Sequence, residues 1–109
     1  MNIIAKGTIL YYIDKYPKAK IALLTWYYEF SKLTFANFNA LKTVYGNASI
    51  VGGNRVIFNI KGNEYRLVFA VNFKQGAAYV IWFGTHNEYD KIKVSTISFD
   101  TAILNYKQK

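Results

Sequence analysis

The stretch GTHNEYDKI contains His86, the only histidine of the chain, followed closely by Tyr89, Asp90 and Lys91. An imidazole has an unperturbed pKa of about 6.5, so it can give or take a proton near neutral pH. His86 could therefore be a general acid or a metal ligand, although a lone histidine after a strand is more often an ordinary hydrogen-bonding loop residue. Asp90 could orient the imidazole, or it could be the N-cap of a following helix.

The arginines are the second group that could do chemistry. Arg55 and Arg66 are the only arginines among 14 lysines and arginines. The planar fork of an arginine can hold two phosphate oxygens at once, whereas lysine is a point charge. Arg66 could instead form an ion pair with Glu64 or Glu88 across neighbouring strands.

A lysine, an arginine and a histidine on one surface could together cleave RNA without a metal. This reaction needs a group that takes the proton of a 2′-hydroxyl, cations that stabilise the charged phosphate, and an acid that protonates the leaving 5′-oxygen. Trp82, Tyr65 and Tyr89 could stack on splayed bases, as aromatic side chains of RNA-binding proteins do. Trp82 could equally be a core residue.

The composition narrows the class of protein. With 109 residues, of which 52% are hydrophobic, the chain is predicted to be one globular domain spanning residues 1–109. Cysteine is absent, which excludes disulfides and thiolate ligands, and one histidine with six scattered acids makes no convincing metal cage. We therefore expect neither a metal nor another cofactor.

The charge and the apolar runs indicate where the protein acts. The first residues do not form a signal peptide, and no apolar run approaches the roughly 20 residues of a membrane span. We expect a cytoplasmic protein without a membrane partner. The formal net charge of +8 indicates a polyanionic partner, or else a solvated coat of lysines.

The first part of the sequence has the apolar spacing of helices. Thr8 is the candidate cap of the first helix, Pro17 would end it, and Gly46 would cap the third. The predicted elements are a strand at 2–6 and helices at 8–16, 18–33 and 37–46. The side of the second helix that is predicted to face the core comprises Leu23, Leu24, Tyr27, Tyr28 and Phe30.

After Gly46 the sequence changes to β-branched and aromatic runs, separated by turns that contain glycine. Helices followed by a meander of strands predict an α+β fold, with the N-terminal strand and the helices packed on one face of a mainly antiparallel sheet. The segment 95–107 has the spacing of a last helix. The predicted strands are 49–51, 55–60, 65–73 and 78–84.

Strand alternation predicts which side chains share a face. The core-facing side chains should be Val56, Phe58, Ile60, Leu67, Phe69, Val71, Ile81 and Phe83. The opposite, open face should hold Arg55, Asn59, Lys61, Arg66, Val68, Ala70, Trp82, Gly84 and His86. Such a face combines cations, a stacking ring and a titratable imidazole.

Two segments carry a more specific signal, NRVIFNIKGNEYRLVFAVNF and FGTHNEYDKI. Four further motifs occur in order and at ordinary spacing before these segments: NIIAK, KYPKAK, TWYYEF and LKTVYGNASIVGGNRV. The last of them overlaps the start of the first segment. The series closely resembles the HigB toxins of bacterial type II toxin–antitoxin modules, a branch of the RelE/ParE-like superfamily. The resemblance runs from Asn2 to Ile92, so that residues 93–109 would be a C-terminal extension.

The resemblance implies a RelE-like fold and a ribosome-dependent mRNA interferase. Such an enzyme is a metal-independent endoribonuclease that cuts translated mRNA in the ribosomal A site and inhibits translation. Its partner would be a cognate helix-turn-helix antitoxin (HigA-like) that represses the operon, so operator DNA would be contacted only through the antitoxin. The alternatives are a ParE-like gyrase poison of the same fold and a non-catalytic RNA- or partner-binding domain.

The resemblance also implies roles for individual residues. The elements that RelE-like toxins use for catalysis fall here on Lys61, Arg66 and His86, and Tyr89 is the candidate for their late tyrosine. Asp90 would orient the histidine. The residues expected to bind RNA, which include asparagines where relatives place basic residues, are Arg55, Asn59, Asn63, Trp82 and Lys91.

Overall fold

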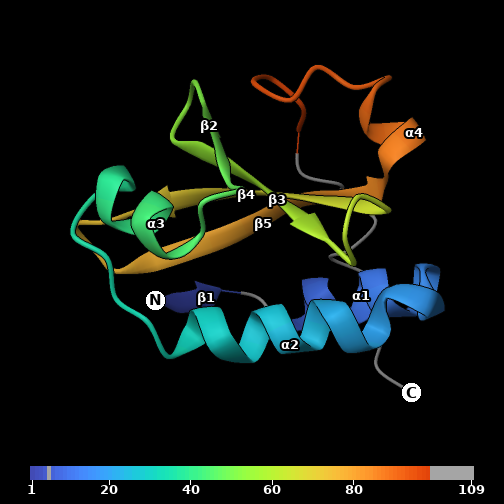
Figure 1. Ribbon diagram of the computed structural model, residues 1–109, viewed down its shortest axis with the longest axis horizontal. Helices are drawn as coiled ribbons and strands as arrows, with labels where there is room; N and C mark the ends of the chain where they lie inside the picture. The colour runs from blue at the N-terminus through green and yellow to red at the C-terminus, as the bar shows by residue number, and fades with distance from the viewer. Residues whose placement is uncertain (5, 99–109) are drawn as a thin grey trace.

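A five-stranded sheet forms the frame of the protein. The computed structural model describes residues 1–4 and 6–98. The strands follow the order β1-β5-β4-β3-β2, with β1 parallel to β5 and the other neighbours antiparallel (Figure 1). The strands are β1 (Asn2–Ile4), β2 (Ser49–Val51), β3 (Arg55–Ile60), β4 (Tyr65–Asn72) and β5 (Ala77–Thr85).

The long helices lie together on one face of the sheet, whereas the short helix α4 and the chain that follows it lie toward the other face (Figure 1). This arrangement confirms the predicted α+β class, with helices on one face of a mainly antiparallel sheet. The N-terminal strand does not lie on that face as predicted, because β1 is an edge strand of the sheet itself and pairs with β5. The helices are α1 (Lys6–Lys15), a 3₁₀ turn (Pro17–Ala19), α2 (Lys20–Ser31), α3 (Phe38–Val44) and α4 (His86–Tyr89).

The first helix begins earlier than predicted. α1 begins at Lys6, so Thr8 lies within the helix, where it is 1% exposed, and the prediction that it caps the helix is wrong. Tyr12 fixes α1 to the sheet, because its ring lies 5.8 Å from the ring of Phe83. Pro17 follows the end of α1, as predicted, and begins the 3₁₀ turn.

α2 turns Leu23, Trp26 and Phe30 into the core. These positions are spaced i, i+3 and i+7, the stripe that a helix presents to a flat sheet. Tyr28 lies outside this stripe and is 51% exposed, so the prediction that it faces the core is wrong. The predicted core-facing side of α2 comprises leucines, tyrosines and Phe30 and omits Trp26, whose ring packs on the sheet.

α3 has a cap at each end, but not the one predicted at its C-terminus. The side chain of Asn37 accepts a hydrogen bond from the backbone N–H of Ala40 at 2.9 Å. At the other end Tyr45 is the C-cap, and its N–H donates to the carbonyl of Leu41 at 2.9 Å. Gly46 follows that cap with a φ outside the left-handed region, so it is not a glycine cap of the expected kind.

The turn between β3 and β4 is tight. Four residues, 61–64, join the paired residues Ile60 and Tyr65, and the first two of them, Lys61 and Gly62, have left-handed φ values of 55° and 64°. Glycine adopts this conformation freely, whereas Lys61 is held in it by the turn. The turn therefore fixes where the lysine projects from the end of the hairpin.

β5 contains a bulge. Val68 pairs with Trp82 and Phe69 pairs with Val80, which leaves Ile81 as an extra residue without a partner on β4. Ile81 is consequently absent from the core cluster, and the prediction that it faces the core is wrong. Alternation resumes after this extra residue, with Phe83 in the core and Trp82 on the outer face.

The outer face is only partly open, contrary to the prediction. Ile57 and Val68 lie on this face, but they are 4% and 0% exposed. The chain after α4 lies on this side of the sheet (Figure 1), and Arg55 Nη1 holds it by donating to the carbonyls of Val94 at 2.8 Å and Ile97 at 2.7 Å. The accessible part of the face is therefore the end near α4 and the β3–β4 turn.

The last predicted helix, at 95–107, is not present where the chain is described. Residues 95–98 form turn and irregular structure. The remainder of that prediction, residues 99–107, lies outside the described residues.

Candidate functional site

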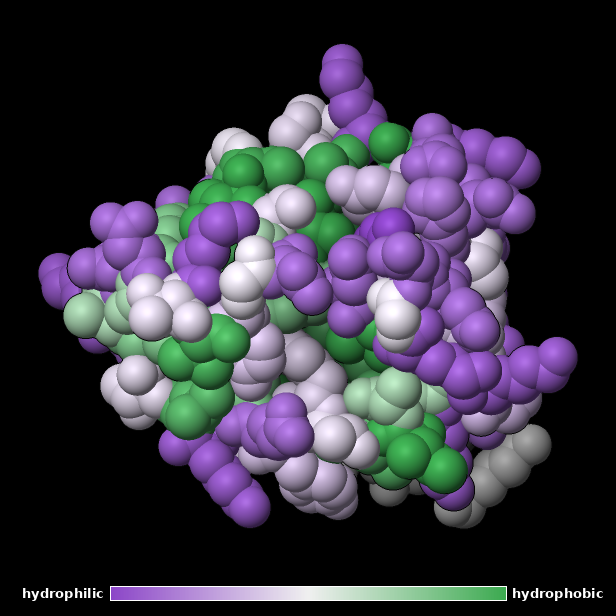
Figure 2. Space-filling view, in the orientation of Figure 1, coloured by the Kyte–Doolittle hydropathy of each residue, from purple (hydrophilic) through white to green (hydrophobic). Residues whose placement is uncertain are grey.

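A row of three residues crosses the open end of the outer face. Asn59 on β3 pairs with Arg66 on β4, and Arg66 pairs with Gly84 on β5. The alternation argument correctly placed these residues on one face. Hydrophilic side chains gather over α4 and the β3–β4 turn (Figure 2), at the same end of the molecule.

Gly84 makes room for an aromatic ring. A Cβ at this position would lie 2.6 Å from two carbon atoms of the Trp82 indole and 3.1 Å from Oε1 of Glu88. The indole therefore lies across the glycine, half-buried, and is not part of the core cluster. Its ring centroid is 6.2 Å from that of Tyr89, so the outer face carries two neighbouring aromatic rings.

Arg66 lies beside these rings. Its Nη1 donates to the carbonyls of Asn63 and Tyr65, both at 3.1 Å, and its Cζ is 6.0 Å from the centroid of the Tyr89 ring. These contacts orient the guanidinium without neutralising its charge. The remaining guanidinium nitrogens have no acceptor in the described part of the chain and are available for an anion.

The alternative that Arg66 pairs with Glu64 or Glu88 is not observed in residues 1–4 and 6–98. Glu64 pairs instead with Lys61, with 3.1 Å between Nζ and Oε2 and with both side chains substantially exposed. An exposed pair of this kind contributes little to stability and opens readily. The Glu64 contact holds Lys61 near the site, and a bound phosphate can replace Glu64 as the partner of Lys61.

His86 is the first residue of α4, and its imidazole is 51% exposed. Its backbone N–H donates to the carbonyl of Glu64 at 2.9 Å, which joins α4 to the end of β4. Nε2 lies 3.8 Å from Oδ2 of Asp90, too far for a hydrogen bond but close enough for attraction when the imidazole is protonated. Thr85 is the N-cap and Asp90 the C-cap of α4, so the alternative that Asp90 is an N-cap is wrong.

Glu88 ties α4 to α1. Its Oε1 accepts hydrogen bonds from the hydroxyl of Tyr16 at 2.7 Å and from the N–H of Thr85 at 2.9 Å. The Thr85 hydroxyl accepts in return from the N–H of Glu88 at 3.2 Å, which completes a capping box. This network fixes the first turn of α4 and, with it, the backbone of His86.

The same network shifts the pKa of both side chains. Burial alone would raise the pKa of the Glu88 carboxyl, but the hydrogen bonds from Thr85 and Tyr16 lower it below its usual value. Burial, and then the hydrogen bond to Glu88, raises the pKa of the Tyr16 hydroxyl well above its usual value. The tyrosine therefore remains a donor and the glutamate an acceptor over the whole neutral range.

A shallow depression of about 420 Å³ lies beside His86 and includes Lys18 from the 3₁₀ turn. Sequence reasoning missed Lys18, Tyr16 and Glu88, because their approach to the histidine depends on how the end of α1 packs against α4. Only the threonine and glutamate spaced three apart, at Thr85 and Glu88, gave a local signal.

The other residues expected to bind RNA occupy different places. Asn59 Nδ2 lies 3.5 Å from Oδ1 of Asn63, so these two side chains lie together over the β3–β4 turn. Lys91 is exposed just after α4. Arg55 lies at the opposite end of β3, half-buried, with its hydrogen bonds directed to the chain after α4.

Residues 1–4 and 6–98 contain no group of three or more histidine, cysteine, aspartate or glutamate side chains able to hold a metal ion. Within the same residues, no helix has both the length and the apolar character needed to cross a membrane.

The α+β fold is compatible with that of a RelE-like toxin domain. Residues 19–92 match the HigB toxin family, described as the RelE-like toxic component of a toxin–antitoxin system, and the chain therefore belongs to this family. It is 29% identical over 111 residues to the mRNA interferase toxin HigB of Escherichia coli K12, an alignment that covers 100% of this chain and 99% of the relative. The mRNA interferase HigB of Shigella flexneri shows the same identity and coverage. Membership in this family implies an antitoxin as partner.

Replacing Tyr16 by Phe should loosen the attachment of α4. The variant loses a hydrogen bond to a partly buried carboxylate, so we expect its free energy of unfolding to fall by about 1–2 kcal/mol at pH 7 in urea titrations. Because the folded-state pKa of Glu88 is lowered, its stabilising effect is complete above the ordinary glutamate pKa of about 4.3 and is lost as the pH falls through the folded value. The difference between the two proteins should therefore narrow in acid. Tyr79→Phe, at a tyrosine that is 40% exposed, is the control and should leave stability unchanged.

Replacing Gly84 by Ala should displace the Trp82 indole. The added Cβ overlaps the ring, so we expect a loss of about 1–3 kcal/mol in the free energy of unfolding, as for other overpacked sites. Gly46→Ala is the matched control, because nothing lies within 4 Å of the added atom. Equal unfolding midpoints for the two alanine variants would show that the ring does not depend on this glycine.

Proposed function

We propose that this single-domain chain is a ribosome-dependent mRNA interferase, which cleaves translated mRNA in the bacterial cytoplasm and thereby inhibits translation. The observation that carries the proposal is the exposed His86 at the start of a rigidly capped α4, at the same end of the sheet as Arg66 and Tyr89. The names of the relatives, mRNA interferases, support the same activity.

The reaction is a transfer of phosphorus from one ribose oxygen to another. The 2′-hydroxyl of the RNA gives its proton to a general base and attacks the adjacent phosphorus, and the bond from phosphorus to the 5′-oxygen breaks. The products are a 2′,3′-cyclic phosphate and a 5′-hydroxyl. His86 donates the proton that the leaving oxygen needs, and Asp90, whose Oδ2 lies 3.8 Å from Nε2, orients the imidazole. Arg66 and Lys61 stabilise the negative charge on the phosphate. No metal ion takes part in this scheme.

The aromatic and polar side chains around these groups would hold the RNA. Trp82 and Tyr89 offer faces on which unstacked bases can lie. Asn59 and Asn63 are paired at the β3–β4 turn and offer hydrogen bonds in place of charge. Lys91, and Lys18 in the depression beside His86, add cations for the phosphates that flank the cut, whereas the tether formed by Arg55 makes it the weakest of the RNA-binding candidates.

The partner that inhibits the toxin is, in this proposal, a HigA-like helix-turn-helix antitoxin. The ribosome and mRNA would be the targets, and operator DNA would be contacted only through the antitoxin. The formal charge of +8 suits both an acidic antitoxin and a ribosomal site lined with RNA phosphates.

Replacing His86 by Gln should abolish cleavage without unfolding the protein. Glutamine keeps a hydrogen-bonding side chain but cannot donate a proton as an acid, so the single-turnover rate on programmed ribosomes should fall by about 10²–10⁴-fold. Ribosome binding should persist, because the cations remain. The wild-type rate for bound substrate should decline as the pH rises and the imidazole loses its proton.

The same assay separates this proposal from the other functions. A variant that cuts at the wild-type rate would remove His86 from the mechanism. Wild-type protein that traps DNA breaks on gyrase and leaves mRNA intact would show a gyrase poison instead. Wild-type protein that binds ribosomes without cutting would show a non-catalytic binding domain.

Replacing Arg66 should distinguish charge from geometry. Arg66→Ala removes both and should cost about 10²-fold or more in the single-turnover rate, by analogy with the loss of one transition-state donor. Arg66→Lys keeps the charge but loses the two-pronged contact, so its rate should fall between those of the alanine variant and the wild type. If Arg66→Ala instead cuts normally and unfolds at lower urea, the arginine is structural.

A further inference from the structure

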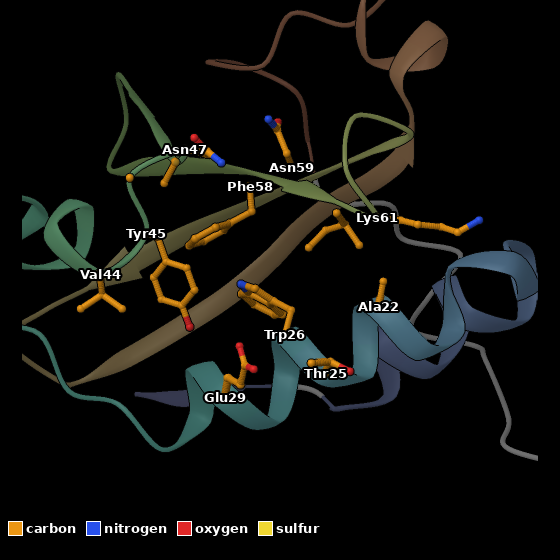
Figure 3. Close-up of a pocket in the computed structure, with 13 residues that line it drawn as sticks. Ala22, Thr25, Trp26, Glu29, Val44, Tyr45, Asn47, Phe58, Asn59 and Lys61 are labelled. Atoms are coloured by element: carbon orange, nitrogen blue, oxygen red, sulfur yellow. The ribbon is translucent and has the colours of Figure 1, made fainter.

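A second concave surface lies on the helical side of the sheet, away from the outer face. It is a cleft of about 450 Å³ between α2, the end of α3 with the loop that follows it to Ala48, and the end of β3 with Lys61. Figure 3 shows the indole of Trp26 rising from α2 into this cleft toward Phe58, while the Tyr45 ring descends from the loop on the other side. Aromatic rings thus form its floor.

One buried donor in the cleft lacks an acceptor. Trp26 is only 6% exposed, and its Nε1–H is inaccessible to solvent and has no hydrogen-bond partner among the described residues. An indole N–H can only donate, and leaving one unpaired in the interior is costly. The Tyr45 hydroxyl is a second donor nearby, since burial and then the charge of Glu29 raise its pKa and keep its proton in place. The cleft therefore calls for an uncharged acceptor such as a backbone carbonyl oxygen, because the Glu29 carboxylate that lines it would repel a second carboxylate.

The strand that borders the cleft has an unpaired edge. β2 pairs with β3 only from Arg55 to Ile57, and the described chain offers no strand beside Phe58, Asn59 and Ile60 on that side. A free edge of this kind accepts an added strand, which supplies alternating N–H and carbonyl groups. An extended peptide lying there would also place side chains over the aromatic floor.

The charges select a polypeptide rather than RNA as the occupant. The Glu29 carboxylate points into the cleft from α2 (Figure 3), where it would repel a phosphate backbone. Val44 at the rim is 57% exposed and offers an apolar contact. The formal charge of +8 on the whole chain attracts an acidic partner over longer distances.

We propose that an extended segment of the antitoxin adds to the free edge of β3, inserts an apolar side chain into the cleft, and accepts the hydrogen bond of Trp26 Nε1. The inference rests on the antitoxin partner of the proposed function. The bound segment runs directly beside Asn59 and Lys61, whose side chains belong to the RNA site (Figure 3). The strand added along the edge of β3 would therefore obstruct the catalytic lysine, whereas a side chain that only fills the cleft beside α2 would not.

The test is the affinity of the purified cognate antitoxin for variants of the full-length toxin, measured by isothermal titration. Thr25 is an exposed residue of α2 that lines the cleft, so Thr25→Arg fills it without disturbing the core. We expect affinity to fall by roughly tenfold or more, as for a blocked anchor pocket. Ile21→Arg is the matched control on the same helix, 81% exposed and outside the cleft, and should change affinity less than about twofold.

Amide and indole exchange measured by NMR gives a second readout. On addition of the antitoxin, exchange of the Trp26 indole N–H and of the edge amides between Phe58 and Lys61 should slow by at least about tenfold. Unchanged exchange, or an unchanged affinity of Thr25→Arg, overturns the proposal. Nuclear Overhauser contacts from residues 99–109 to Trp26 in the free toxin would overturn it as well, because the chain itself would then occupy the cleft.

Ribosome assays keep this inference separate from the proposed function. Thr25→Arg should cut mRNA at the wild-type rate when no antitoxin is present, since the substitution lies on the helical side of the sheet. If wild-type toxin fails to cut but Thr25→Arg still loses the antitoxin, the proposed activity is wrong and the docking surface stands. If wild-type toxin cuts and both arginine variants bind the antitoxin equally, the docking surface alone is wrong.

Discussion

A stack of aromatic rings between α2 and the sheet is the interaction on which the rest of the structure depends. Phe58 and Phe69, neighbours on β3 and β4, lie parallel with centroids 4.9 Å apart and an angle of 3° between their planes. Trp26 and Phe30 pack on both of them at centroid distances between 5.1 and 5.9 Å. Burial of each such ring stabilises the fold by about 1.5–3 kcal/mol. Because side chains alternate along a strand, fixing these rings inward also fixes Asn59 outward and so orients the functional face.

The stack has consequences on both sides of the sheet. On the helical side, the tryptophan fills the space between α2 and β3 but leaves its N–H unpaired at the bottom of a cleft. On the other side, two polar contacts fix segments that the aromatic packing does not reach. Glu88 joins α4 to α1 through Tyr16, and Arg55 holds the chain after α4 on this side of the sheet. The open surface is thereby confined to one end, where Arg66 lies.

Most of the sheet could be predicted from the sequence because its signals are local. β-branched and aromatic runs separated by glycine turns gave four of the strands nearly to their bounds, and the turn at Lys61 followed from the adjacent glycine. The prediction failed where one element depends on another. The bulge at Ile81 is invisible to simple alternation, and Trp26 was overlooked because the phase of α2 is set by the rings that it meets. Val68 is 0% exposed on the face that alternation predicted to be open, because alternation along a strand does not show what covers a face.

The sequence by itself determined the α+β class, the shared outer face of Asn59 and Arg66, and the family to which the chain belongs. These conclusions need only the period of a strand, the order of the elements and an ordered series of motifs. The tertiary structure alone decided that His86 begins a capped helix held by Tyr16 and that the cations near it include Lys18. It also decided that the tryptophan with a buried, unpaired donor lines a cleft bordered by an unpaired strand edge. These features join residues far apart in the chain, and such contacts arise only when helices and strands pack and exclude water between them.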